Sequence, residues 1–255
     1  MNYNTDRIES CNTIEELFSI WKSKPIVNTT YKEDNTKIPL VIDHSGVFIS
    51  DGYVDKDTWE SKKDGKRILF VLKEAYGEDD DWSLTEWLRR TGPSSNIWYR
   101  VVEWTYGIIN TTATKVARYS PDNISLEHSE DVPNEWLRQI AVVNLKKSGG
   151  RSSSNYSEIS AYADADREEL KREIEILDPD IVVCGATFSD INHIGGGIIK
   201  PNPCDNWYYY SDSFGGRERL FIDYYHPANR YPSLLNYYGL INIYQQALIE
   251  KETKK

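Results

Sequence analysis

Polar side chains follow the apolar strands that the sequence predicts, and they could do chemistry together. The apolar run from Leu69 to Leu72 is followed at once by Lys73, Glu74 and Tyr76. A carboxylate at a strand end, partly shielded by Tyr76, could orient a water molecule or stabilise a developing cation. Glu74 could equally pair with Lys73 or Arg67 at the surface, because most charged side chains are solvated.

Asn144 and His226 stand at the ends of later strands. A buried amide must either bond the backbone locally or meet a ligand with complementary groups, such as a pyrimidine edge. His226 is held in extended backbone by Pro227 and could donate a hydrogen bond to an oxyanion. The alternative for His226 is a core histidine whose ring is satisfied by the backbone. The sequence leaves both alternatives open at both positions.

A fourth candidate is the segment KKSGGRSSS, residues 146–154. It combines Lys146, Lys147 and Arg151 with two glycines and four serines. Exposed backbone amides and cations could cradle a phosphate. The segment lacks P-loop spacing, and an ordinary flexible loop is the alternative interpretation.

Cysteine usage and motif content exclude several site classes. The three cysteines, Cys11, Cys184 and Cys204, lie far apart without a CxxC pair. They cannot supply a four-cysteine metal or iron–sulfur site, and their number is typical of a reduced, cytoplasmic protein. There is no Ser-His-Asp elbow, HExxH or GxGxxG motif. We therefore predict neither a metal nor a cofactor.

The elements that must position these side chains alternate between strand and helix. Strands are predicted at residues 67–72, 139–145, 180–186 and 219–227, with an extra strand at 206–212. Helices are predicted at residues 12–23, from a capping box at Ser83 and Glu86, from Asn96 to Ile108, and at 164–177 and 233–250. A β-hairpin is predicted over 38–54, turning at His44-Ser45-Gly46.

Continuous apolar strands that alternate with helices favour a mainly parallel sheet covered on both faces. Ligands of such sheets bind beyond the carboxyl ends of the strands, where the four candidates lie. We expect an N-terminal helix and hairpin extension over residues 1–65, packed on one α/β domain over residues 66–255.

Charge and hydropathy limit the partners. The 255 residues carry a net charge of −10, which argues against a general nucleic-acid binder. A local basic groove remains compatible, because charges beyond about 10 Å are largely screened at physiological salt. No window is long and apolar enough to cross a membrane, and the polar N-terminus is not a signal peptide.

Three segments, taken in order, resemble motifs of the uracil-DNA glycosylase superfamily: L-K-E-A-Y-G (72–77), V-V-N-L-K (142–146) and Y-H-P-A-N (225–229). In that family one strand ends in Gly-Gln-Asp-Pro-Tyr or Gly-Glu-Ala-Pro-Gly, another in Asn, and a later one in His-Pro-Ser. Residues 158–185 look like the helix and strand that precede the histidine motif in several bacterial branches. The resemblance covers about residues 66–250. It implies a three-layer α/β/α fold around a mainly parallel four-stranded sheet.

The resemblance also implies roles for single residues. Glu74 falls where the family has its water-activating or cation-stabilising carboxylate, and His226 where a group stabilises the departing uracil anion. Asn144 matches the amide that reads the uracil edge. Tyr76 matches the tyrosine that blocks the thymine methyl group. Trp82 is a candidate for stacking on a flipped base.

The implied activity is hydrolysis of the N-glycosidic bond of uracil or another modified base in DNA, a DNA-repair reaction. The partner would be single- or double-stranded DNA, or a nucleotide, contacted through Lys73, Lys146, Lys147, Arg151 and Arg230. The alternative is a nucleic-acid- or nucleotide-binding relative without glycosylase activity. Its basis is that Leu72-Lys73 replaces Gly-Gln and that no apolar wedge follows His226-Pro227. An unrelated flavodoxin-like or hydrolase-like enzyme is a third possibility.

Overall fold

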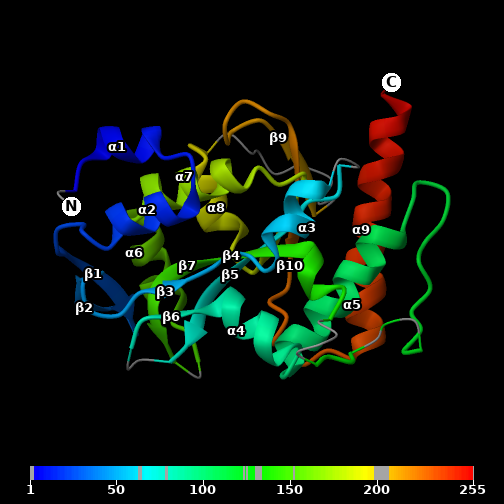
Figure 1. Ribbon diagram of the computed structural model, residues 1–255, viewed down its shortest axis with the longest axis horizontal. Helices are drawn as coiled ribbons and strands as arrows, with labels where there is room; N and C mark the ends of the chain where they lie inside the picture. Colours follow the sequence, from blue (N-terminus) through cyan, green and yellow to red (C-terminus); the bar gives the residue numbers. More distant parts are fainter. Residues whose placement is uncertain are drawn as a thin grey trace.

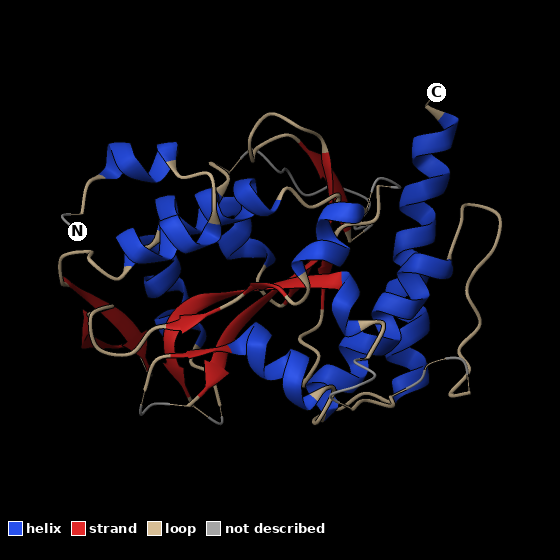
Figure 2. Ribbon diagram, in the orientation of Figure 1, coloured by secondary structure: helices blue, strands red, loops and turns tan. Residues whose placement is uncertain are grey.

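The centre of the protein is a six-stranded mixed sheet with helices on both faces (Figures 1 and 2). The computed structural model describes residues 3–62, 65–77, 80–122, 124, 126–129, 134–151, 153–197 and 207–254. The strands follow the order β4 (Gly52–Tyr53), β7 (Ile140–Gly150), β5 (Ile68–Tyr76), β8 (Ile181–Gly185), β10 (Arg219–Tyr224) and β9 (Tyr208–Ser211). The four inner strands are parallel and the two short edge strands are antiparallel. The predicted α/β class and mainly parallel sheet are confirmed.

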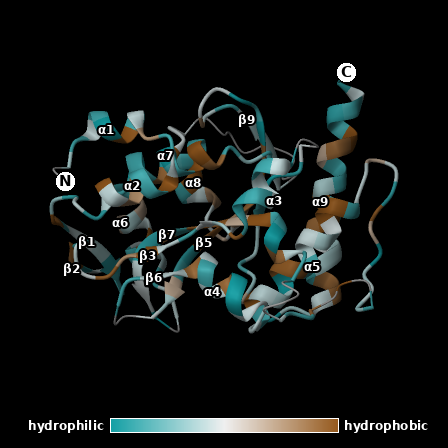
Figure 3. Cartoon of the chain, viewed as in Figure 1, coloured by the Kyte–Doolittle hydropathy of each residue, from teal (hydrophilic) through white to brown (hydrophobic). Residues whose placement is uncertain are grey.

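Two hydrophobic cores cover the two faces of the sheet. One face is covered by α4 (Leu84–Thr91), α5 (Asn96–Asn110) and α9 (Ser233–Thr253). The other is covered by α1 (Thr5–Ser10), α2 (Ile14–Trp21), α3 (Lys56–Ser61), α6 (Tyr156–Ala165), α7 (Arg167–Leu177) and α8 (Phe188–Ile194). Neighbouring strand residues point to opposite faces, so Phe70 stacks on Trp104 of α5 while Val71 joins the second core. Apolar residues therefore gather at the centre (Figure 3).

The N-terminal hairpin lies earlier in the chain than predicted. It consists of β1 (Val27–Glu33) and β2 (Thr36–Ile42), and the turn residues Asp34 and Asn35 both have left-handed backbone angles. Such a two-residue turn matches the twist of paired strands. The predicted hairpin over 38–54 is wrong, because after the turn at 44–46 the chain forms β3 (Ile49–Ser50), which pairs with β6 (Trp82–Ser83). It then adds β4 to the central sheet.

Two further boundaries differ from prediction. Strand β7 runs on to Gly150, because β5 continues beside it past a bulge and Tyr76 pairs with Gly150. The predicted loop over 146–154 therefore begins as strand. The helix predicted over 164–177 is confirmed as α7, which begins at Arg167, whereas residues 164 and 165 end α6. The two helices meet at Asp166. The Asp166 carboxylate is buried at this junction and accepts hydrogen bonds from Lys24 and His44.

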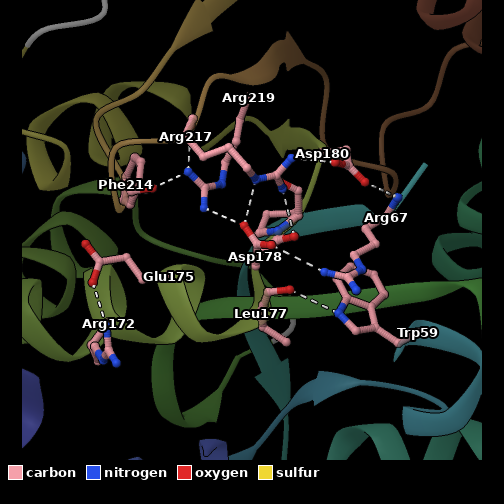
Figure 4. Close-up of polar contacts among 11 residues, drawn as sticks. Trp59, Arg67, Arg172, Glu175, Leu177, Asp178, Asp180, Phe214, Arg217 and Arg219 are labelled. Atoms are coloured by element: carbon pink, nitrogen blue, oxygen red, sulfur yellow. Dashed lines mark hydrogen bonds and ion pairs between the residues drawn. The ribbon is translucent and has the colours of Figure 1, made fainter. Parts of the chain in front are cut away.

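The segment Leu-Asp-Pro-Asp at the end of α7 forms a polar corner at the amino ends of the parallel strands (Figure 4). Asp178 has a left-handed backbone, and its carboxylate lies 2.8 Å from Arg217 Nε and 2.9 Å from the second terminal nitrogen of Arg219. The indole N–H of Trp59 donates to the carbonyl of Leu177 at 3.0 Å. These bonds join α3, β8 and β10 at the end of the sheet opposite to the polar strand tips.

Within the described residues, none of the helices combines the length and the apolar character that crossing a membrane requires.

Candidate active site

The carboxyl ends of β5 and β7, the loop after β10, and helices α4 and α5 enclose a cavity of about 940 Å³. The wall is mainly apolar and includes Leu72, Leu84, Trp87 and Trp98. Seven of the ten residues predicted to form a site line this one cavity: Lys73, Glu74, Tyr76, Trp82, Asn144, Arg151 and His226. A concave site with a few convergent polar groups is the usual form of a ligand pocket.

Glu74 presents one oxygen that is bound and one that is not. Its Oε2 lies 3.3 Å from the ammonium group of Lys146, the residue beside it on β7. Its Oε1 is buried and accepts no hydrogen bond within the described part of the chain. Gly150 makes room for this side chain, since a Cβ at that position would lie 2.5 Å from Glu74 Cγ. The carboxylate is therefore held in place with one acceptor oxygen left over.

Lys146 and Lys147 do not line the cavity. Lys146 is buried, and its Nζ lies 2.9 Å from Glu158 Oε1 as well as beside Glu74. Burial alone would lower the pKa of Lys146, but the hydrogen bond and charge of Glu158, together with the charge of Glu74, raise it. Lys147 is fully buried, 2.5 Å from Asp51 and 2.8 Å from Glu173. Neither ammonium group is placed to contact a phosphate, contrary to the sequence prediction.

Asn144 lies on β7 beside Leu72 and is 2% exposed. Its backbone N–H donates to Asp51 Oδ2 at 2.7 Å, and its side-chain Nδ2 donates to the same oxygen at 3.4 Å. Asp51 stands between β3 and β4, far from Asn144 in sequence. Of the two alternatives for this amide, the structure supports a ligand-facing position, since the side chain lines the cavity and is anchored by a carboxylate.

His226 is neutral and has a defined tautomer. The N–H of Ala228 donates to His226 Nδ1 at 3.2 Å, so the ring carries its hydrogen on Nε2. Burial, reinforced by the positive charge of Lys73, lowers the pKa of His226 to about 4. At neutral pH the ring can therefore donate one hydrogen bond from Nε2 without carrying charge.

Arg100 of α5, which sequence reasoning missed, holds the loop that carries His226. Its guanidinium group donates to the carbonyls of Pro227, Asn229 and Tyr231. These contacts span about half of the chain, so no local pattern signals them. They make the loop a rigid wall of the cavity.

The cations of the cavity differ in how they are held. Lys73 donates to the hydroxyl of Tyr156 at 3.0 Å and lies 4.1 Å from the centre of that ring. Arg151 is exposed on the cavity wall. Arg230 is exposed but lies outside the lining of the cavity. Tyr156 is a further lining residue that sequence analysis did not single out.

The aromatic candidates differ in their burial. Tyr76 is 76% exposed and stands at the rim. Trp82 is half-buried, packs edge-on against Trp87 at 6.4 Å, and is positioned by the pairing of β6 with β3. Trp82 thus offers a ring to a ligand inside the cavity, and Tyr76 offers one to a ligand at its entrance.

Within the described ranges, no three His, Cys, Asp or Glu side chains gather as ligands of a metal ion would. Cys11 and Cys184 are buried free thiols, and Cys204 lies outside the described residues.

No protein-family model matches the chain, and no curated protein matches it.

Proposed function

We propose that the protein hydrolyses the N-glycosidic bond of uracil or another modified base in DNA. The observation that carries the proposal is the convergence of Glu74, Asn144 and His226 on one cavity from three separate parts of the chain. Cleavage of this bond builds negative charge on the base and positive charge on the sugar. A site for it needs a hydrogen-bond donor for the first and a carboxylate for the second.

On the base side, the Asn144 amide supplies an acceptor and a donor for a base edge. His226 donates from Nε2 to an oxygen of the base as that oxygen becomes negative. Because the His226 ring is already neutral in the ground state, it does not have to lose a proton during the reaction. Its hydrogen bond to the base strengthens as negative charge builds on the base oxygen.

On the sugar side, Glu74 acts through its unpaired Oε1. This oxygen can accept a proton from an attacking water molecule or stabilise the cationic sugar. Lys146 fixes the other oxygen, so that the carboxylate need not reorient during the reaction.

The remaining lining residues fit a nucleotide unit. A cavity of about 940 Å³ is at the upper end of the range for small-molecule sites, and holds a base together with its sugar. Lys73 and Arg151 can face the phosphates, and Trp82 can stack on an unpaired base. A base within a duplex would first have to leave the stack.

The test is release of free base from oligonucleotides carrying uracil, hypoxanthine or xanthine, in single and double strands. Glu74→Gln and His226→Gln should each slow release about 10²–10⁴-fold. Glu60→Gln, on the exposed face of α3, is the matched control and should not. Absence of release from all these substrates by the native protein would refute the proposal.

A second candidate function is nucleotide or DNA binding without hydrolysis, favoured by the two cations that share the cavity with aromatic side chains. It predicts salt-dependent binding that Lys73→Met and Arg151→Met weaken, with no release of base.

A further inference from the structure

We infer that Asp51 is a positioning residue that sets the orientation of the Asn144 amide, and thereby the class of base edge that the cavity accepts. For the identity of the ligand, this inference rests on the proposed function. The contacts that support it belong to the protein alone.

Asp51 contacts Asn144 twice through one oxygen. Oδ2 accepts from the backbone N–H of Asn144 at 2.7 Å and from its Nδ2 at 3.4 Å. A carboxylate oxygen is only an acceptor, so the amide nitrogen must face it and the amide oxygen must point elsewhere. Turning the amide over would place two acceptor oxygens against each other in a buried site.

Asp51 is itself held by a buried cation. Its Oδ1 lies 2.5 Å from Lys147 Nζ, and the side chains of Asp51, Lys147 and Glu173 are all fully buried. Burial, and then the negative charge of Asp51, raise the pKa of Glu173, although Lys147 opposes this shift. Lys147 thus pairs with both carboxylates, and the raised pKa of Glu173 reduces the negative charge that this buried cluster has to balance.

The backbone at Asp51 is also fixed. The next residue, Gly52, has φ of +114°, and a Cβ there would lie 2.9 Å from Ile14 Cδ1. Lys147 lies over the rings of Phe18 and Trp21 of α2. Asp51 therefore connects the N-terminal segment to Asn144 in the cavity wall. Lys147 holds Asp51 in place but does not itself line the cavity.

A fixed amide distinguishes two classes of base. Uracil, hypoxanthine and xanthine present a lactam edge, with a ring N–H beside a carbonyl oxygen. Cytosine and adenine present the reverse order, with a ring nitrogen acceptor beside an amino group. An amide that cannot turn over matches only one order, whereas a freely rotating amide matches both. Because the proposed substrate presents the lactam edge, Asp51 on this proposal holds the amide in the orientation that matches this edge.

The test compares the native protein with Asp51→Asn, in which the new amide can face Asn144 with either its oxygen or its nitrogen. The ratio of kcat/KM for uracil over cytosine in otherwise identical oligonucleotides should fall roughly tenfold or more, mainly through a higher KM for uracil. Asp57→Asn, an exposed residue of α3, is the control and should leave the ratio unchanged. A folded Asp51→Asn protein with the native ratio would overturn the inference.

A second measurement needs neither activity nor a stable variant. Nitrogen-15 relaxation of the Asn144 side-chain amide in the native protein should give an order parameter of about 0.85, the value typical of rigid backbone. A value below about 0.6 would show that Asp51 does not hold the amide. If the native protein releases no base, the proposed function fails, while an order parameter below about 0.6 would still refute the role of Asp51 independently of activity.

Discussion

The protonation of His226 offers a sharp test of the cavity. Its pKa is lowered from the ordinary value of 6.5 to about 4, first by burial and then by the charge of Lys73. Between these two pH values the unfolded chain binds a proton at this residue and the folded protein does not. His226 therefore favours the folded state fully above pH 6.5, and this contribution is lost as the pH falls towards 4.

The expected size follows from the two values. A difference between 6.5 and about 4 corresponds to about 3 kcal/mol of unfolding free energy. His226→Gln cannot take up this proton. On acidification from pH 7 to pH 4, the unfolding free energy of the variant should therefore fall less than that of the native protein, by about 3 kcal/mol. Urea denaturation of both proteins across this range measures the difference.

Nuclear magnetic resonance gives the same quantity directly. The ring signals of His226, assigned by their absence in His226→Gln, should titrate near pH 4 and show the hydrogen on Nε2. Lys73→Met should raise this midpoint but leave it below 6.5, because burial is the larger cause. Lys37→Met, on the exposed hairpin, is the matched control. A midpoint near 6.5, or a hydrogen on Nδ1, would refute the reasoning.

Three substitutions test other parts of the account. Gly150→Ala forces Glu74 away from its position, so the rate of base release should fall about tenfold or more. Gly46→Ala is the control, because a Cβ at Gly46 meets nothing within 4 Å, and it should keep the native rate in the same assay. Arg100→Met removes the guanidinium group that donates to three loop carbonyls, so hydrogen exchange of the loop after β10 should speed up. Unchanged exchange would contradict the bracing role of Arg100. Arg219→Met removes a buried guanidinium group from the polar corner and should lower the free energy of unfolding, measured by denaturation, by about 1–3 kcal/mol. The rate of base release should stay native, because the corner and the cavity lie at opposite ends of the sheet. A lower rate at an equal fraction of folded protein would contradict this separation.

The convergence of the strand ends was predictable from the sequence because it depends on topology alone. Apolar strands that alternate with helices give a parallel sheet, and the carboxyl ends of its strands meet at one edge. Glu74 and Asn144 lie on neighbouring strands for this reason, and both line the cavity with His226. The helix start at Ser83 was equally predictable, since the hydrogen bond that the Ser83 hydroxyl accepts from the N–H of Glu86 is local.

The predictions that failed depend on partners distant in the sequence. Lys146 and Lys147 look like loop cations, but β5 extends the ladder beside them and buried carboxylates neutralise them. Lys147 meets Asp51 across 96 positions, a distance over which no periodicity carries information. The hairpin was misplaced for a different reason: the β-branched run before Asp34 was overlooked as a strand.

The central claim is that Glu74, Asn144 and His226 together hold and cleave one nucleotide unit. A crystal structure of Glu74→Gln with a short single-stranded oligonucleotide containing one deoxyuridine tests it most directly. The account predicts an intact uracil in the cavity, its edge hydrogen-bonded to the Asn144 amide and one oxygen within hydrogen-bond distance of His226 Nε2. A uracil bound elsewhere, or one that contacts neither residue, would contradict it.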